Sequence, residues 1–168
     1  MDSRHSTWRE GLIAGAIGAT VVAVWFFVVD IIAGHPLYTP TILGQAVFSV
    51  LGSTAGDPQL LHVAVYTVFH YVVFMLFGVL TMTIVHRSER QPSILALLLI
   101  AFVVLEMGFY GYTAILSAAG VLPGELAWYQ VAVGNLLAAV AMGTYMYKLH
   151  PAIGRNFNRA LADEPRGS

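Results

Sequence analysis

The 168-residue sequence contains no cysteine and few charged residues. Without cysteine, the chain forms no disulfide, binds no metal through thiolate and has no cysteine nucleophile. Charged residues make up 10% of the chain and hydrophobic residues 58%, whereas soluble domains average about 25% and about 45–50%. So few charges cannot cover the surface of a soluble fold, and a disordered chain needs the opposite composition. The composition is that of an integral membrane protein.

The sequence also lacks the short motifs that carry known chemistry. No Walker loop, HExxH, GxSxG or CxxC is present, so no motif indicates an enzyme. The net charge of −1 and the lack of a basic helix face argue against a nucleic-acid partner. Gly11, Gly15 and Gly18 resemble part of a phosphate loop, but inside an apolar run this spacing indicates close helix packing. Small residues of the same character recur near the C-terminus at Gly134, Ala138, Ala139 and Gly143.

Four apolar segments have close to the length of about 20 residues that a helix needs to cross the hydrocarbon core. They cover about 11–33, 60–85, 94–119 and 126–147. They are continuously apolar and do not alternate, so they fit helices and not barrel strands. The sequence predicts an all-α integral membrane fold, with a single four-helix transmembrane domain over residues 1–150 and a polar tail over residues 151–168.

The basic residues give the predicted bundle an orientation. With four spans, all eight lie on one side, at Arg4, Arg9, Arg87, Arg90, Lys148, Arg155, Arg159 and Arg166. The loops at about 34–59 and 120–125 contain none. The positive-inside rule then places both termini in the cytoplasm. This bias suits a bacterial inner membrane.

The first outer loop is predicted to contain a short helix. Thr39 precedes Pro40, as an N-cap residue precedes a proline at the first helical position. The apolar stretch that follows, about residues 40–51, is too short to span a bilayer. It fits a re-entrant or interfacial helix across the outer mouth of the bundle, and a helix lying flat on the membrane surface fits equally well.

Ionisable side chains inside predicted spans are costly, so each is a candidate functional residue. The sequence places Asp30, His62, His70 and Glu106 there. With a helical rise of about 1.5 Å per residue, Asp30 and His62 lie near the outer ends of their spans. By the same measure His70, Glu106 and Asn135 share a layer near the midplane, each on a different helix.

Polar residues follow one face of the second span and one face of the third. His62, Tyr66 and His70 are spaced i, i+4, i+8, and a similar stripe on the third span begins with Glu106 and Tyr110. The inner halves of these spans are almost wholly apolar, which predicts an outward-facing polar pocket centred on His70 and Glu106. The predicted lining is His70, Glu106, Asn135, Tyr66, Tyr110, Asp30 and His62.

The first function that fits such a pocket is the binding of a small ligand or a proton. A histidine beside a carboxylate shares its proton, and the two groups titrate as a unit. The pair could also act on a lipid-soluble substrate by acid–base chemistry.

The second function is metal or haem binding. The candidate ligands are His62, Asp30, His35, His70 and Glu106. His62 and His70 are about 12 Å apart along one helix and cannot share one metal ion. A haem would take His70 as its axial ligand.

The third interpretation is structural. Buried polar side chains also hold membrane helices together, at about 0.6 kcal/mol each on average. The protein would then be an accessory subunit of a larger membrane complex or a homo-oligomer, with the lipid bilayer as its other partner.

Overall fold

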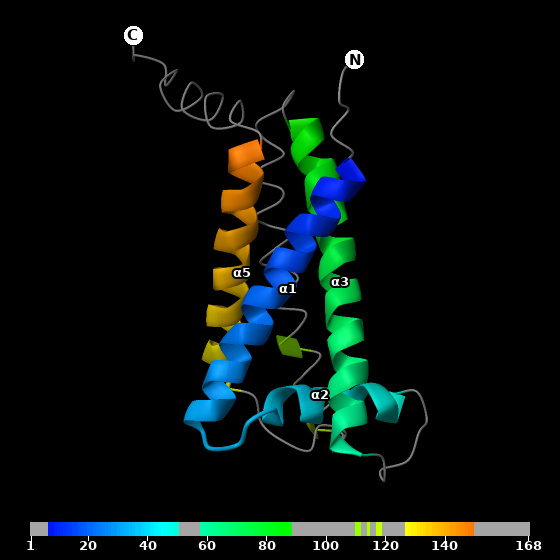
Figure 1. Ribbon diagram of the computed structural model, residues 1–168, viewed down its shortest axis with the longest axis vertical. Coiled ribbons are helices and arrows are strands. Elements are labelled where there is room, and N and C mark those ends of the chain that lie inside the picture. Colours follow the sequence, from blue (N-terminus) through cyan, green and yellow to red (C-terminus); the bar gives the residue numbers. More distant parts are fainter. Residues whose placement is uncertain are drawn as a thin grey trace.

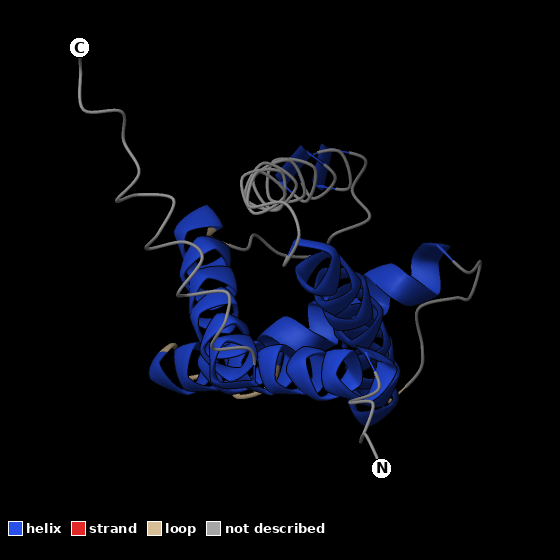
Figure 2. Cartoon of the chain, turned by 90° about the horizontal axis from the view of Figure 1, so that it is seen from above, coloured by secondary structure: helices blue, strands red, loops and turns tan. Residues whose placement is uncertain are grey.

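The computed structural model describes residues 7–50, 58–88, 110, 111, 114, 117, 118 and 127–149. Within these residues every regular element is a helix (Figure 2). The helices are α1 (Thr7–Ile32), α2 (Tyr38–Val50), α3 (Gln59–Ser88) and α5 (Trp128–Leu149). The predicted third span, with Glu106, lies outside the described residues except at five positions, which are helical. The all-helical prediction is confirmed.

The predicted segments 11–33, 40–51, 60–85 and 126–147 correspond to these helices, with ends shifted by about one turn or less. Among the described helices, two are long and apolar enough to cross a membrane, namely α1 and the Gln59–Ile84 part of α3. Helix α2 has 13 residues and is too short, as predicted. Both long apolar helices leave large side chains exposed, including Val68 and Leu76 of α3, which are 66% and 62% exposed.

Helix α1 is central to the described bundle. It runs diagonally and packs against both α3 and α5, whereas α2 packs against α3 and lies crosswise near the end of α1 (Figure 1). In the view from above, α1 runs across the bundle, with α3 beside its start and α5 beside its end (Figure 2). The start of α1 and the ends of α3 and α5 lie together at the opposite end from α2 (Figure 1).

Glycines bring α1 and α3 into backbone contact. A methyl group on Gly78 would overlap the carbonyl oxygen of Gly11, and one on Gly15 would overlap the backbone at Phe74. The packing role predicted for Gly11 and Gly15 is therefore confirmed. On α5 the prediction holds only in part, because Gly143 is exposed and its own Cβ would meet nothing within 4 Å.

A tight corner joins α1 to α2. Gly34 has a φ of +79°, and the amides of Gly34 and His35 donate to the carbonyl oxygens of Ile31 and Asp30 at 3.0 Å each. This pattern is the Schellman motif, in which a glycine in the left-handed conformation satisfies the last carbonyls of a helix. The Leu37 carbonyl accepts the first hydrogen bond of α2, from Thr41 at 3.2 Å. Leu37 is thus the N-cap, and Thr39, predicted for that role, lies in the first turn.

A hydrogen bond from Trp25 ties α1 to α5. Its indole Nε1 donates to the Gln130 carbonyl oxygen at 2.8 Å, and its ring packs on Gly134. We expect Trp25→Phe to keep most of the packing and to lower the free energy of unfolding by about 1 kcal/mol, the usual net value of such a bond. Denaturation in detergent measures this change. Trp8→Phe is the control, because Trp8 is 66% exposed, and equal effects of the two variants would contradict a role for the bond.

Candidate functional site

His70 lies near the middle of α3 and is buried, at 9% exposure. Its Nε2 atom is 3.1 Å from the carbonyl oxygen of Ala19 on α1. A carbonyl only accepts hydrogen bonds, so Nε2 is the donor and carries the proton. In the neutral ring Nδ1 is then an acceptor, the atom with which an imidazole takes a proton or a metal ion.

Aromatic rings surround the His70 imidazole. Its centroid is 4.7 Å from that of Phe74, 5.5 Å from that of Tyr66 and 6.1 Å from that of Tyr71. Tyr66 and His70, which were predicted to share one face, are therefore in ring contact. These rings and the bond to Ala19 hold the imidazole in a fixed orientation.

The next residues along both helices form a second polar contact. Thr20 follows Ala19, Tyr71 follows His70, and the two hydroxyl oxygens are 2.9 Å apart. No sequence pattern paired these two residues. A signal was available, because Thr20 is one of few polar side chains in its half of the span and Tyr71 adjoins His70.

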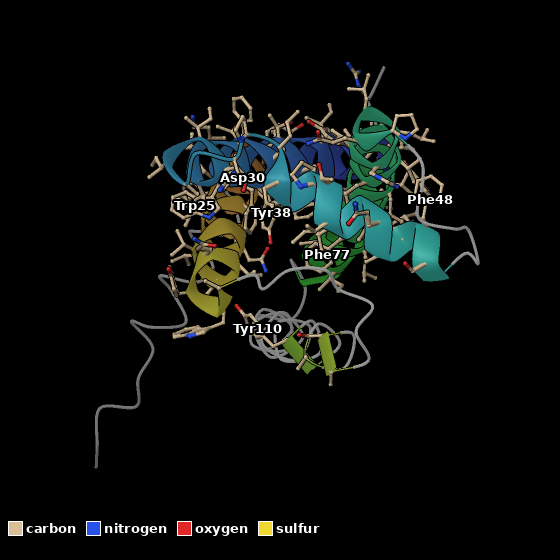
Figure 3. The ribbon with its side chains drawn as sticks, turned by 90° about the horizontal axis from the view of Figure 1, so that it is seen from below. Trp25, Asp30, Tyr38, Phe48, Phe77 and Tyr110 are labelled. Atoms are coloured by element: carbon tan, nitrogen blue, oxygen red, sulfur yellow. The ribbon has the colours of Figure 1, made fainter. Side chains whose placement is uncertain are left out.

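Asp30 ties the end of α1 to the start of α2. It is 3% exposed, and its two carboxylate oxygens accept from the Thr39 amide at 2.8 Å and the Thr39 hydroxyl at 2.7 Å. Figure 3 shows Asp30 beside the start of α2, near Tyr38. The amide of a first-turn residue has no partner within its own helix, so Asp30 caps α2 from another element.

His62 lies at the contact between α2 and α3. It is 5% exposed, its ring meets Phe48 edge-on at 5.3 Å, and its backbone packs closely against Gly44. Its Nδ1 atom is buried and has no hydrogen-bond partner in the described part of the chain. The His62 side chain therefore packs against α2 and helps to hold it on α3. It lies about 12 Å from His70 along α3.

The remaining predicted residues are dispersed. Asn135 is half-buried on α5, and His35 is exposed at the corner between α1 and α2. The Tyr110 hydroxyl donates to the Trp128 carbonyl oxygen at 3.1 Å, and Figure 3 shows Tyr110 beside the start of α5. Glu106 lies outside the described residues.

Of the predicted site, the structure shows Tyr66 and His70 in contact. Asp30 lies eleven positions beyond Ala19, about 16 Å further along α1, and is engaged with α2. Among the residues that the structure describes, no three histidine, aspartate or glutamate side chains are grouped so as to hold a metal ion. The arrangement at His70 offers one accepting imidazole nitrogen, Nδ1, with aromatic rings around it.

Comparison with known proteins gives no relative. No family model matches the chain, and neither a curated protein nor a solved structure matches it significantly.

Proposed function

We propose that this chain is an integral membrane protein with four spans and both termini in the cytoplasm of a bacterial cell. The exposed apolar faces of α1 and α3 support a membrane placement, because the core helix of a soluble protein would be mostly buried. The basic residues Arg9 and Lys148 belong to the end opposite α2, where α1 begins and α5 ends. This distribution supports the proposed orientation.

We propose further that the protein binds a small ligand, a proton or a metal ion at His70, in a polar centre open to the outer side. The observation that supports this proposal is the buried imidazole, with Nε2 bonded to Ala19 and Nδ1 left to accept. Glu106 is the proposed acidic partner, from its predicted depth on the third span. A fixed imidazole with one accepting nitrogen can hold the donor of an organic ligand, take a proton or coordinate a metal.

Two substitutions at His70 separate binding from packing. His70→Gln keeps an N–H group that can donate to the Ala19 carbonyl but loses the imidazole. His70→Phe keeps a planar ring and loses the donor. We expect the Gln variant to keep a free energy of unfolding within about 1 kcal/mol of the original protein and the Phe variant to lose about 1 kcal/mol or more. Both should lose the bound species, and Glu106→Gln should weaken its binding.

The measurement identifies what is bound to the protein after purification in mild detergent without added metal. A visible absorption spectrum detects haem, elemental analysis detects a metal ion and mass spectrometry of a solvent extract detects an organic ligand. A change in the titration of the His70 nitrogen-15 NMR signals in Glu106→Gln detects proton sharing. A proposal of binding is wrong if no such species or coupled titration is found, or if His70→Gln retains it in full.

A second candidate function is that of an accessory subunit in a larger membrane complex. It is favoured by the use of polar groups in helix contacts, such as Asp30 with Thr39 and Trp25 with Gln130. In this case His70→Gln would change nothing measurable. Native mass spectrometry of the protein taken from its own membrane would show a partner in fixed stoichiometry, and a chain found alone would contradict this candidate.

A further inference from the structure

Two hydroxyl groups meet at the outer edge of the seam between α1 and α3. The Thr20 hydroxyl oxygen lies 2.9 Å from the Tyr71 hydroxyl oxygen and 2.8 Å from the Ala16 carbonyl oxygen. Thr20 is exposed and Tyr71 is half-buried, whereas the preceding residues, Ala19 and His70, are buried. The hydroxyl pair therefore lies at the surface of the helix bundle.

The pair lies at the middle of both apolar helices. Thr20 is about halfway along α1, and Tyr71 is about halfway along the Gln59–Ile84 part of α3. Val24 and Val68, one turn away on the two helices, are apolar and exposed, at 56% and 66%. At this depth a bilayer contains no water to bond a hydroxyl group. Only a molecule dissolved in the membrane could add a hydrogen bond to the pair.

The number of hydroxyl protons in the pair decides whether that molecule must supply a hydrogen-bond donor or an acceptor. Each hydroxyl has one proton to donate and lone pairs to accept. Both observed contacts are satisfied together when Tyr71 donates to Thr20 and Thr20 donates to the Ala16 carbonyl. No proton is then left, and the remaining capacity is that of an acceptor. A ligand must therefore supply the donor.

We propose that the Thr20–Tyr71 pair is a lateral binding site for a membrane-soluble phenol or alcohol. The ligand hydroxyl donates to the tyrosine oxygen, and its apolar body lies along the exposed side chains of α1 and α3. This inference rests on the membrane placement proposed above and is independent of ligand binding at His70.

The test compares ligands that differ only in the donor. The whole chain, reconstituted in phosphatidylcholine vesicles, is labelled with a diazirine-bearing alkylphenol, and the labelled peptides are located by mass spectrometry. We expect saturable labelling of α1 and α3 around Thr20 and Tyr71. Unlabelled 4-dodecylphenol should compete about fivefold better than 4-dodecylanisole, the ratio that a hydrogen bond of about 1 kcal/mol gives.

A matched pair of variants locates the effect. Tyr71→Phe should remove the fivefold difference. Thr67→Val should retain it, because the exposed Thr67 hydroxyl bonds to the Val63 carbonyl of its own helix, at 2.7 Å. Tetradecan-1-ol as a third competitor separates the two sources of a hydroxyl donor. Competition equal to that of the phenol supports an aliphatic alcohol, and weaker competition supports a phenol.

Equal competition by the phenol and its methyl ether overturns the proposal, and the hydroxyl pair is then only a contact between helices. That comparison uses the unaltered chain, so it decides the question even where Tyr71→Phe does not assemble. Flotation of the vesicles on a density gradient keeps the two proposals distinguishable. Protein that does not float with the vesicles contradicts the membrane placement itself, and protein that floats without discriminating the ligands contradicts this inference alone.

Discussion

Gly78→Ala is expected to destabilise the protein by roughly 3 kcal/mol, toward the upper end of the cost of overpacking a core. The added methyl group would overlap the carbonyl oxygen of Gly11 and the backbone of Gly15, and neither atom belongs to a flexible side chain that could move aside. Helices α1 and α3 would have to separate along the seam. The free energy of unfolding in detergent measures the loss.

The matched control for this substitution is Gly143→Ala on α5. Gly143 is exposed, and a methyl group there meets nothing within 4 Å. Because alanine is a better helix former than glycine, this variant should gain about 0.5–1 kcal/mol. Gly78→Ala makes the same gain in helix propensity and still loses overall. Changes of the same sign in both variants would show that the contact at Gly78 is not limiting.

Asp30→Ala is expected to release α2 from the bundle. It leaves the buried amide and hydroxyl of Thr39 without their acceptors, at about 1–3 kcal/mol for each unsatisfied group. Since the chain has no cysteine, a single Ala46→Cys substitution gives a clean probe of α2, where Ala46 is 7% exposed. We expect its reaction with a maleimide to become at least about tenfold faster, as a loss of about 1.4 kcal/mol predicts.

The conservative variant Asp30→Asn controls for the loss of the charge. Its amide oxygen can still accept from the Thr39 amide, and its NH₂ group can donate to the Thr39 hydroxyl, so labelling should stay close to that of the original protein. Ser49→Cys, at an exposed position of α2, reports the rate without protection. A slow, unchanged reaction at Ala46→Cys in the Asp30→Ala background would mean that α2 is held by its contact with α3 alone.

Within the described residues, the sequence placed the helices and part of the small-residue packing well, and the partners of the polar groups poorly. Helix ends followed from apolar runs and from the residues that interrupt them. The position of the α2 cap did not, because Leu37 adopts a φ of +67°, which no propensity favours for leucine. The corner depends on the bond between Asp30 and Thr39, a contact between helices that spacing along one helix cannot reveal.

The candidate site shows the same division. The i, i+4 spacing put Tyr66 and His70 on one face, and their rings meet. It could not show that His70 bonds to a backbone carbonyl, because every residue has one and only packing selects Ala19. Asp30 and His62 looked like members of one site by residue type, yet each is engaged at α2.

By itself the sequence determined an all-helical chain with long apolar helices, a short helix between the first two and small residues at helix contacts. These properties follow from composition and periodicity, which act within one helix. The tertiary structure alone decided that α1 is central, that Gly78 completes the seam and that Thr20 meets Tyr71 at its edge. Such pairings depend on the rotation and crossing of two helices, which packing fixes and local sequence does not encode.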